Sequence, residues 1–211
     1  MIKAVILDFD GIILESVDVK GQVFLEVFKN YPEHAQAILD YHYANGGVSR
    51  FEKFRHIHQH ILKVPLPEST FNDLCKRFAD LVVEQVLKVD FVPGAREFLK
   101  NHYRTLDLFI VSATPDEEIK AIVRAKGLDH FFKGVHGSPQ NKSAWTWVIL
   151  NQGPYRPDEV FWVGDALSDW QAAQDHGIKF LGRVTDRNIF EDRPMQGKFQ
   201  SLDEIAQYVE E

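Results

Sequence analysis

The sequence predicts an α/β fold in which a doubly wound parallel sheet carries an inserted, all-helical subdomain. Over most of the chain, short apolar runs alternate with helical patterns, which is typical of crossover units around a parallel sheet covered on both faces. Residues 15–88 break this rhythm, because they hold several amphipathic helical patterns and no convincing strand. A segment of roughly seventy residues is too long for a loop inside a compact domain, so we expect it to fold as helices.

The expected strands are apolar runs bounded by turn residues. They lie at 2–7, 106–111, 160–163 and 178–181, with a weaker run at 132–135. The expected helices between them lie at 94–102, 116–126, 142–151 and 168–176. Each has about the length of a crossover helix. Near the end of the chain, Ser201 followed by Glu204 is a capping-box pattern, which predicts a final helix through Val209.

Proline and glycine residues divide the inserted segment into its expected helices. These lie near 17–30, 33–44, 49–62 and 69–88. Hinges are expected near Gly11–Glu15 and Lys88–Pro93. The expected domains are therefore a core formed by residues 1–14 and 89–211 and a helical cap formed by residues 15–88.

Composition excludes several classes of protein. The chain of 211 residues has 24 Lys and Arg against 31 Asp and Glu, a net charge of −7, which disfavours a nucleic-acid binder because phosphate neutralisation needs a basic face. No segment reaches the ~18 apolar residues of a membrane span, and the N-terminal apolar run is too short for a signal peptide. The single cysteine, Cys75, excludes an intrachain disulfide framework and a multi-Cys zinc site. We expect a cytoplasmic protein without nucleic-acid or membrane partners, whose oligomeric state no pattern reveals.

Polar residues follow the expected strands where each strand ends. Asp8 and Asp10 follow the first strand, Ser112 the second, and Asp165 with Asp169 a later one. In open α/β sheets ligands bind at this edge. Carboxylates gathered there would repel one another and have raised pKa values unless a cation lay between them, and a hard divalent ion such as Mg²⁺ suits oxygen ligands.

A cationic side chain is also expected there to balance the charge of a bound phosphate, and Lys142 opens a helix at a suitable place. Taken alone, each residue has an ordinary structural explanation: Ser112 as a turn or N-cap residue, Lys142 as a solvated helix lysine, and Asp169 as an acidic residue favoured at a helix start. Only their combined order indicates a site.

That order resembles the four motifs of the haloacid dehalogenase-like hydrolases, particularly the subgroup of phosphoglycolate phosphatase and β-phosphoglucomutase. The motifs are Asp8-Phe9-Asp10-Gly11-Ile12, Val111-Ser112-Ala113, Lys142, and Val163-Gly164-Asp165-Ala166-Leu167-Ser168-Asp169. The resemblance covers nearly the whole chain and implies a Rossmann-like core with a helical cap. Ile12 departs from the Thr or Val usual in the family, an aliphatic exchange that should leave the chemistry intact.

The resemblance also implies a role for each motif residue. Asp8 would attack phosphorus to form an aspartyl-phosphate, and Asp10 would act as general acid and then as general base. The implied Mg²⁺ ligands are Asp8, the Asp10 backbone carbonyl and Asp165, with Asp169 either a further ligand or a residue that positions the others. The implied phosphate-binding groups are Ser112, Lys142 and the backbone N–H groups near Phe9 and Ala113.

Specificity is then expected to come from the cap. Residues 46–53 resemble a cap loop that carries a substrate-contacting arginine in the mutase-like subgroup. Arg50 could bind a second anionic group of the substrate in a bidentate manner, or it could be a surface arginine at a helix start. Lys20 could face the substrate or be a solvated helix lysine.

The favoured function is that of an Mg²⁺-dependent phosphatase for a small phosphorylated metabolite, such as a sugar phosphate. A phosphomutase of the β-phosphoglucomutase type would use the same chemistry but return the phosphoryl group to its substrate. A phospho-acceptor signalling module is a further alternative, although it has no need of a cap. A binding protein that has lost turnover is disfavoured because every catalytic position is filled.

Overall fold

A parallel sheet forms the centre of the protein. The computed structural model describes residues 1–186, 190 and 193–210. Within them the sheet has six strands in the order β3-β2-β1-β4-β5-β6, and all neighbouring pairs are parallel. The strands are β1 (Ala4–Leu7), β2 (Asp107–Pro115), β3 (Gly134–Ser138), β4 (Val160–Gly164), β5 (Lys179–Arg183) and β6 (Gly197–Phe199). The predicted α/β class with a parallel sheet is confirmed.

Strand β1 lies in the middle of the sheet, and all of its side chains are buried. Successive side chains of a strand point to opposite faces, and β1 accordingly contributes to two separate apolar clusters. Val5 and Leu7 belong to the larger cluster, whereas Ala4 and Ile6 belong to the smaller one on the other face. Burial on both faces explains why the sequence of β1 reads as a continuous apolar run.

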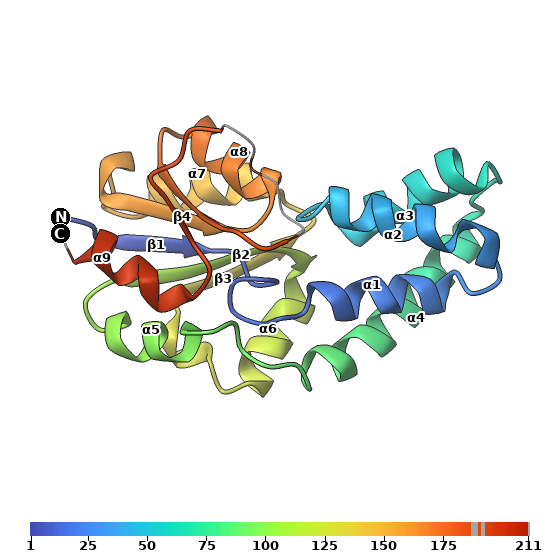
Figure 1. The fold of residues 1–211 in the computed structure, drawn as a ribbon, viewed down its shortest axis with the longest axis horizontal. Coiled ribbons are helices and arrows are strands. Elements are labelled where there is room, and N and C mark those ends of the chain that lie inside the picture. Colours follow the sequence, from blue (N-terminus) through green and yellow to red (C-terminus); the bar gives the residue numbers. More distant parts are fainter. Residues whose placement is uncertain (187–189, 191–192, 211) are drawn as a thin grey trace.

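Helices cover both faces of the sheet (Figure 1). Helices α7 (Lys142–Gln152) and α8 (Leu167–Asp175) lie on one face, and α5 (Ala95–His102), α6 (Asp116–Ala125) and α9 (Ala206–Val209) lie on the other. The expected crossover helices are therefore present. None of the helices in the described part of the chain combines the length and apolar character needed to cross a membrane.

The remaining helices lie together beyond the carboxyl ends of the central strands (Figure 1). They are α1 (Val17–Val27), α2 (Ala35–Ala44), α3 (Arg50–His56) and α4 (Glu68–Val86), and a π-helical turn, Ile57–Leu62, extends α3. We refer to residues 17–86 as the helical insertion. Its buried residues, Phe24, Phe54 and Phe78 among them, are continuous with the larger apolar cluster of the sheet. The boundaries expected for two domains, after residues 14 and 88, stay a prediction.

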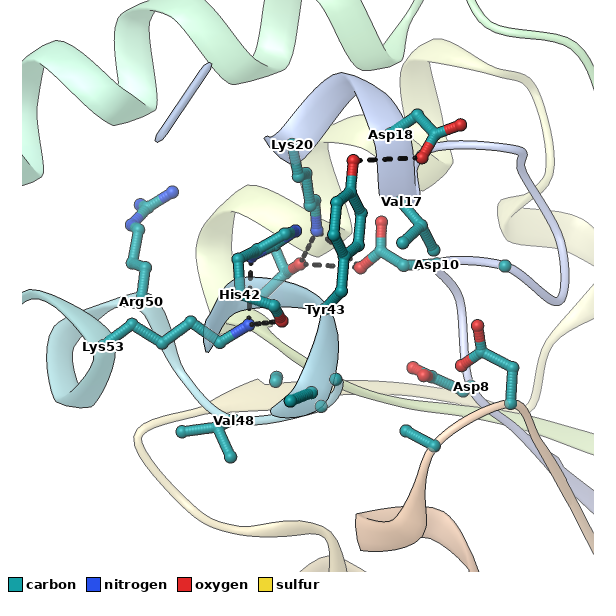
Figure 2. Close-up of a pocket in the computed structure, with 18 of the residues that line it drawn as sticks. Asp8, Asp10, Val17, Asp18, Lys20, His42, Tyr43, Val48, Arg50 and Lys53 are labelled. Atoms are coloured by element: carbon teal, nitrogen blue, oxygen red, sulfur yellow. Dashed lines mark hydrogen bonds and ion pairs between the residues drawn. The ribbon is translucent and has the colours of Figure 1, made fainter. Parts of the chain in front are cut away.

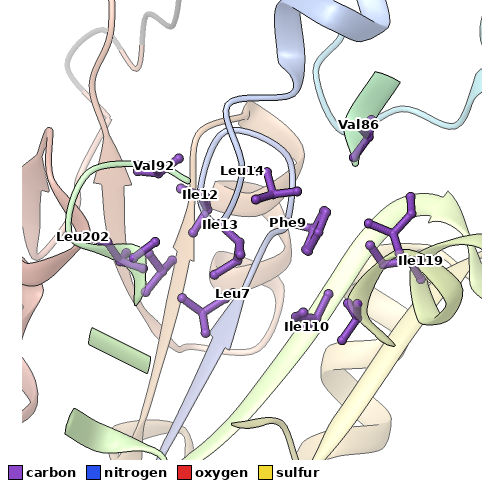
Figure 3. Packing of buried hydrophobic residues seen from close by; sticks show 14 of the residues in the cluster. Leu7, Phe9, Ile12, Ile13, Leu14, Val86, Val92, Ile110, Ile119 and Leu202 are labelled. Carbon is purple, nitrogen blue, oxygen red and sulfur yellow. The ribbon is translucent and has the colours of Figure 1, made fainter. Parts of the chain in front are cut away.

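The loop that follows β1 is packed into this larger cluster. Figure 3 shows Phe9, Ile12, Ile13 and Leu14 between Leu7 of β1 and Val86 at the end of α4. The two connections to the helical insertion run side by side, because Glu15 N–H donates to the Asp90 carbonyl at 3.0 Å and Val92 N–H to the Ile13 carbonyl at 3.0 Å. Two connecting segments that are hydrogen-bonded to each other thus attach the helical insertion to the sheet.

The structure corrects three details of the sequence-based expectation. Strand β6 was not predicted, because its three residues, Gly-Lys-Phe, carry no apolar run. The helix expected at 49–62 changes to π-helical geometry after His56. The final helix begins with a 3₁₀ turn, Leu202–Ile205, and becomes α-helical only at Ala206, although the Ser201 N–H does donate to the Glu204 carboxylate at 2.8 Å.

Candidate active site

A cavity of about 640 Å³ lies between the helical insertion and the carboxyl edge of the sheet. Residues from both parts line it. From the sheet side these include Asp8, Asp10, Ala113 and Asp165, and from the helical insertion Lys20, His42, Arg50 and Lys53. The sequence-predicted catalytic and cap residues therefore meet at one cavity (Figure 2).

The nearby carboxylates Asp8, Asp165 and Asp169 form a compact cluster. One carboxylate oxygen of each lies within 4.8 Å of the others. Asp8 directly follows β1 and its side chain is only 3% exposed, while Asp165 directly follows the neighbouring strand β4. Parallel alignment of β1 and β4 therefore brings together residues that are far apart in the sequence.

Lys142, the first residue of α7, lies within this cluster. Its Nζ is 2.8 Å from Asp8 Oδ2 and 2.5 Å from Asp169 Oδ1. The second Asp169 oxygen accepts the Ala166 N–H at 3.0 Å, which fixes that carboxylate at the start of α8. Lys142 is thus held between two carboxylates rather than solvated, and Asp169 is part of the cluster.

Burial and mutual repulsion perturb the ionisation of these groups. Burial, together with repulsion from Asp169 and Asp10, raises the pKa of Asp8 to about 7 despite the attraction of Lys142. Burial and the Asp8 charge raise the pKa of Asp165 well above its ordinary value, and burial also raises that of Asp169. Burial alone would lower the pKa of Lys142, but the carboxylates of Asp169 and Asp8 raise it. One lysine therefore does not compensate the negative charge of the cluster.

These carboxylates fit a divalent cation. The cluster has an excess of negative charge, and its donors are the hard oxygen atoms that Mg²⁺ and similar ions prefer. Gly11, in the loop after β1, lies next to this cluster and has a positive φ of 75°. A Cβ at this position would lie 2.2 Å from Asp165 Oδ2. Glycine therefore allows the loop after β1 to approach the Asp165 carboxylate closely.

Asp10 lies apart from this cluster, in a hydrogen-bonded network of its own. Its carboxylate accepts from Ser16 Oγ at 2.5 Å and Lys20 Nζ at 2.5 Å, and from Thr114 Oγ1 at 3.3 Å. Lys20 Nζ also donates to Thr114 Oγ1 at 2.7 Å. Burial favours the neutral acid, but the Lys20 ammonium and the Ser16 hydroxyl outweigh it and lower the pKa of Asp10. The metal-binding role expected for the Asp10 backbone carbonyl stays a prediction.

The expected phosphate-binding groups lie near the same edge. Ser112 lies inside β2, which continues to Pro115, and not after the strand as expected. It is buried, and its Oγ accepts the Thr114 N–H at 3.1 Å. The Phe9 N–H donates to Asp8 Oδ1 at 2.7 Å. Ala113 lines the cavity. Their binding of phosphate remains a prediction that this arrangement permits.

Arg50 faces the cavity but is joined to the sheet side. Its two terminal nitrogens donate to the two carboxylate oxygens of Glu118 on α6 at 3.0 and 2.7 Å, and both side chains are only 9% exposed. Arg50 is therefore not a solvated surface residue: its two terminal nitrogens are paired with Glu118, while its buried Nε has no hydrogen-bond partner among the described residues. A substrate contact by Arg50 stays a prediction.

The loop between α2 and α3 approaches the acidic cluster from the helical insertion. Gly47 has a positive φ of 73°, and a Cβ there would lie 2.0 Å from Ser168 Oγ and 3.1 Å from Lys142 Nζ. The Ser168 hydroxyl donates to the Gly46 carbonyl at 3.3 Å. Gly47 thus allows the insertion to cover the cluster closely.

Several polar residues of the site were missed in the sequence. Ser16 and Thr114 both bind Asp10, and Glu118 binds Arg50. Arg183, near the end of β5, holds the loop after β1 by donating to the Gly11 carbonyl at 2.8 Å and to the Glu15 carboxylate at 3.0 and 2.6 Å. A hydroxyl residue two positions after Ser112 was a visible signal for Thr114, whereas the other pairings depend on tertiary contacts.

Comparison with solved structures identifies similar folds. A predicted phosphoglycolate phosphatase from Haemophilus somnus is 18% identical, with a TM-score of 0.76 over 98% of this chain and 97% of that one. CbbY from Rhodobacter sphaeroides, solved with phosphate, is 18% identical, with a TM-score of 0.78 over 97% and 96% of the two chains. A candidate β-phosphoglucomutase from Thermotoga maritima is 18% identical, with a TM-score of 0.71 over 99% of each chain. These similarities show a shared fold.

Sequence comparison assigns the family. No curated protein has significant sequence similarity to the chain. The family model of the haloacid dehalogenase-like hydrolases, however, matches residues 5–183. This range includes β4, all of β1 except its first residue, and the whole helical insertion. The chain therefore belongs to the haloacid dehalogenase-like hydrolases, as its motifs indicated.

Proposed function

We propose that this hydrolase is an Mg²⁺-dependent phosphatase that acts on a small phosphorylated metabolite through an aspartyl-phosphate intermediate. The main support is the position of Asp8, which is buried at the end of β1, contacts Lys142 at 2.8 Å and faces the cavity. The proposed nucleophile, a fixed cation and a cavity that could hold a substrate therefore lie together.

In the first half-reaction, an Asp8 oxygen forms a bond to phosphorus and the bond from phosphorus to the ester oxygen breaks. The leaving alkoxide needs a proton, for which the protonated form of Asp10 is the proposed source. Asp10 lies beside the cavity and is oriented by Ser16, Lys20 and Thr114. An approaching phosphate would raise the pKa of Asp10, because like charges disfavour the ionised form.

In the second half-reaction, water attacks phosphorus and the bond between phosphorus and Asp8 breaks. Asp10, now a carboxylate, accepts the proton of this water. The contact with Lys20 favours that ionised form, since it lowers the pKa of Asp10. Inorganic phosphate leaves and Asp8 is regenerated.

Charge stabilisation is the main contribution of the remaining residues. Lys142, the Ser112 hydroxyl and the backbone N–H groups of Phe9 and Ala113 would bind the oxygens of the transferring phosphoryl group. Asp8, Asp165 and the Asp10 carbonyl would hold Mg²⁺, with Asp169 completing the acidic cluster. When bound, the ion neutralises charge on the phosphoryl oxygens.

Release of inorganic phosphate from a panel of phosphate esters, with and without Mg²⁺, tests this function. We expect Mg²⁺-dependent turnover by the wild type and a loss of at least about a thousandfold in Asp8→Asn, because the amide is a poor nucleophile. Asp73→Asn, at an exposed carboxylate of α4, is the control and should retain full activity.

Normal turnover by Asp8→Asn would reject the proposal. Product analysis separates the alternatives: an isomerised phosphate ester with a requirement for a bisphosphate activator would identify a phosphomutase. Stable phosphorylation of Asp8 by a small donor without catalytic phosphate release would identify a signalling module.

A further inference from the structure

The charge of Arg50 is already balanced. The guanidinium forms a two-fold hydrogen-bonded ion pair with Glu118, and both side chains are almost completely buried. Phe78 lies beside it, with its ring centre 5.1 Å from the Arg50 Cζ. An anion that used Arg50 as its receptor would have to compete with a carboxylate that belongs to the protein.

Lys53 lies one helical turn after Arg50 on α3, and residues three apart share a helix face. Its side chain lines the same cavity but is only 3% exposed. The Lys53 Nζ lies 3.1 Å from His42 Nδ1 and 3.0 Å from the His42 carbonyl oxygen (Figure 2). Among the described residues, no carboxylate lies within ion-pair distance of Lys53.

The contacts of Lys53 leave it able to bind one more acceptor. A lysine ammonium has three N–H donors, and His42 accepts two of them through its ring nitrogen and its carbonyl. Burial lowers the pKa of His42 to about 3, so its ring is neutral and can accept at Nδ1. In the described part of the chain, the third N–H has no hydrogen-bond acceptor.

A buried ammonium without a counter-ion is unfavourable. Burial, with repulsion from Lys20, lowers the pKa of Lys53 to about 7. An anion placed in the cavity would supply both the missing charge and the missing acceptor.

We propose that Lys53 is the specificity-determining residue of the cavity and binds a second anionic group, a carboxylate or a second phosphate, at the end of the substrate opposite the phosphoryl group on Asp8. This inference rests on the proposed phosphatase function. It replaces the expectation that Arg50 is the receptor, and it gives Arg50 the role of joining the helical insertion to α6 through Glu118.

The test compares esters that differ in one distal group. 2-Phosphoglycolate is paired with ethyl phosphate, and 6-phosphogluconate with sorbitol 6-phosphate, so that a short and a long substrate each occur with and without a carboxylate. We expect the wild type to favour the carboxylate member of at least one pair in kcat/KM. Lys53→Met, which keeps the apolar stem but removes the charge, should reduce that preference at least tenfold, mainly through KM. Lys76→Met, at an exposed lysine of α4, is the control and should keep it.

Binding provides a readout that does not require turnover. In the Asp8→Asn background, calorimetric titration with each of the two carboxylate esters should give, for at least one of them, a Kd at least tenfold higher when Lys53→Met is added, whereas Lys53→Arg should restore part of the affinity. Equal effects of Lys53→Met on both members of every pair, in kcat/KM and in Kd, would overturn the inference. Absence of phosphate release from all four esters would instead count against the phosphatase function, while the titration would still test Lys53.

Discussion

The two walls of the cavity carry opposite unbalanced charges. On the sheet side, Asp8, Asp165 and Asp169 share the single cation Lys142 among the described residues of their cluster, so negative charge is in excess. On the helical side, Lys20 and Arg50 pair with carboxylates that come from the sheet side, and Lys53 has no such partner in the described residues.

This difference teaches how the ligand can be recognised. A wall with excess carboxylates suits a divalent cation, whereas a wall with a buried, uncompensated ammonium suits an anion. A phosphorylated substrate with a second negative group, bound together with a metal ion, would satisfy both walls. In the proposed function, the sheet edge would carry the chemistry and the helical insertion would select the substrate.

Removing the cation of the sheet side should have the largest effect. Lys142→Met removes the charge that contacts Asp8 and Asp169, and loss of one stabiliser of transition-state charge typically lowers kcat by about 10²–10³. The variant should also gain more thermal stability from added Mg²⁺ than the wild type, because the cluster becomes more negative.

Steady-state kinetics and melting temperatures with and without Mg²⁺ check this prediction. Lys100→Met, at an exposed lysine on α5, serves as the control. A Lys142→Met protein with normal kcat would show that Lys142 does not stabilise charge in the transition state.

Breaking the Arg50–Glu118 ion pair, which joins the two walls of the cavity, should have the next largest effect. Arg50→Met or Glu118→Gln alone leaves a buried group without its partner, which should lower the free energy of unfolding by about 3 kcal/mol. The double variant should lose less than the sum of the two single losses, because neither unpaired charge then remains.

Urea unfolding of the four proteins measures this coupling. Ser168→Ala, which removes a more exposed hydrogen bond between the same two regions, is the matched comparison and should change stability by no more than about 0.5 kcal/mol. If the losses in free energy of unfolding for the Arg50 and Glu118 variants are strictly additive, the ion pair does not stabilise the contact between the helical insertion and α6.

Lys53 should produce a smaller effect that depends on pH. Its folded-state pKa of about 7 lies below the ordinary 10.5, because burial and the nearby charges of Lys20 and Lys142 outweigh the attraction of Asp10. Between these two pH values the unfolded chain holds a proton that the folded chain lacks. The free energy of unfolding should therefore rise with pH in this range, by at most about 1.4 kcal/mol per pH unit.

Urea unfolding at pH 7 and pH 9, with wild type and Lys53→Met side by side, isolates this contribution. From pH 7 to pH 9, the wild type should gain more free energy of unfolding than the variant. His42 is neutral at both pH values and therefore does not contribute to the difference between the two proteins. Equal gains in the two proteins would mean that Lys53 is not buried as an uncompensated group.

The sequence predicted the core elements better than the contacts of the insertion. The central strands β1 and β4 were visible because burial on both faces requires an unbroken apolar run. The edge strand β6 was not visible, since its three residues lack that pattern. Asp8, Asp165, Asp169 and Lys142 were singled out from the sequence, and their meeting follows from parallel strands that end at one edge.

The roles of the cationic side chains of the helical insertion could not be predicted from the sequence. Lys20 and Arg50 each look like a helix lysine or arginine, and their partners Thr114 and Glu118 lie 94 and 68 residues away in the chain. Lys53 lies in the segment 46–53 that resembles a cap loop, but it was not singled out, because only the fold shows that its charge has no ion-pair partner among the described residues.

The amino-acid sequence by itself determined the parallel sheet, the helical insertion and the motif residues that mark the chain as a haloacid dehalogenase-like hydrolase. Those features depend on local periodicity and on residue types at strand ends. Only the tertiary structure decided which charges neutralise one another across the cavity. The physical reason is that ion pairing depends on the direction and burial of side chains from distant segments, which only the packing of the insertion against the sheet establishes.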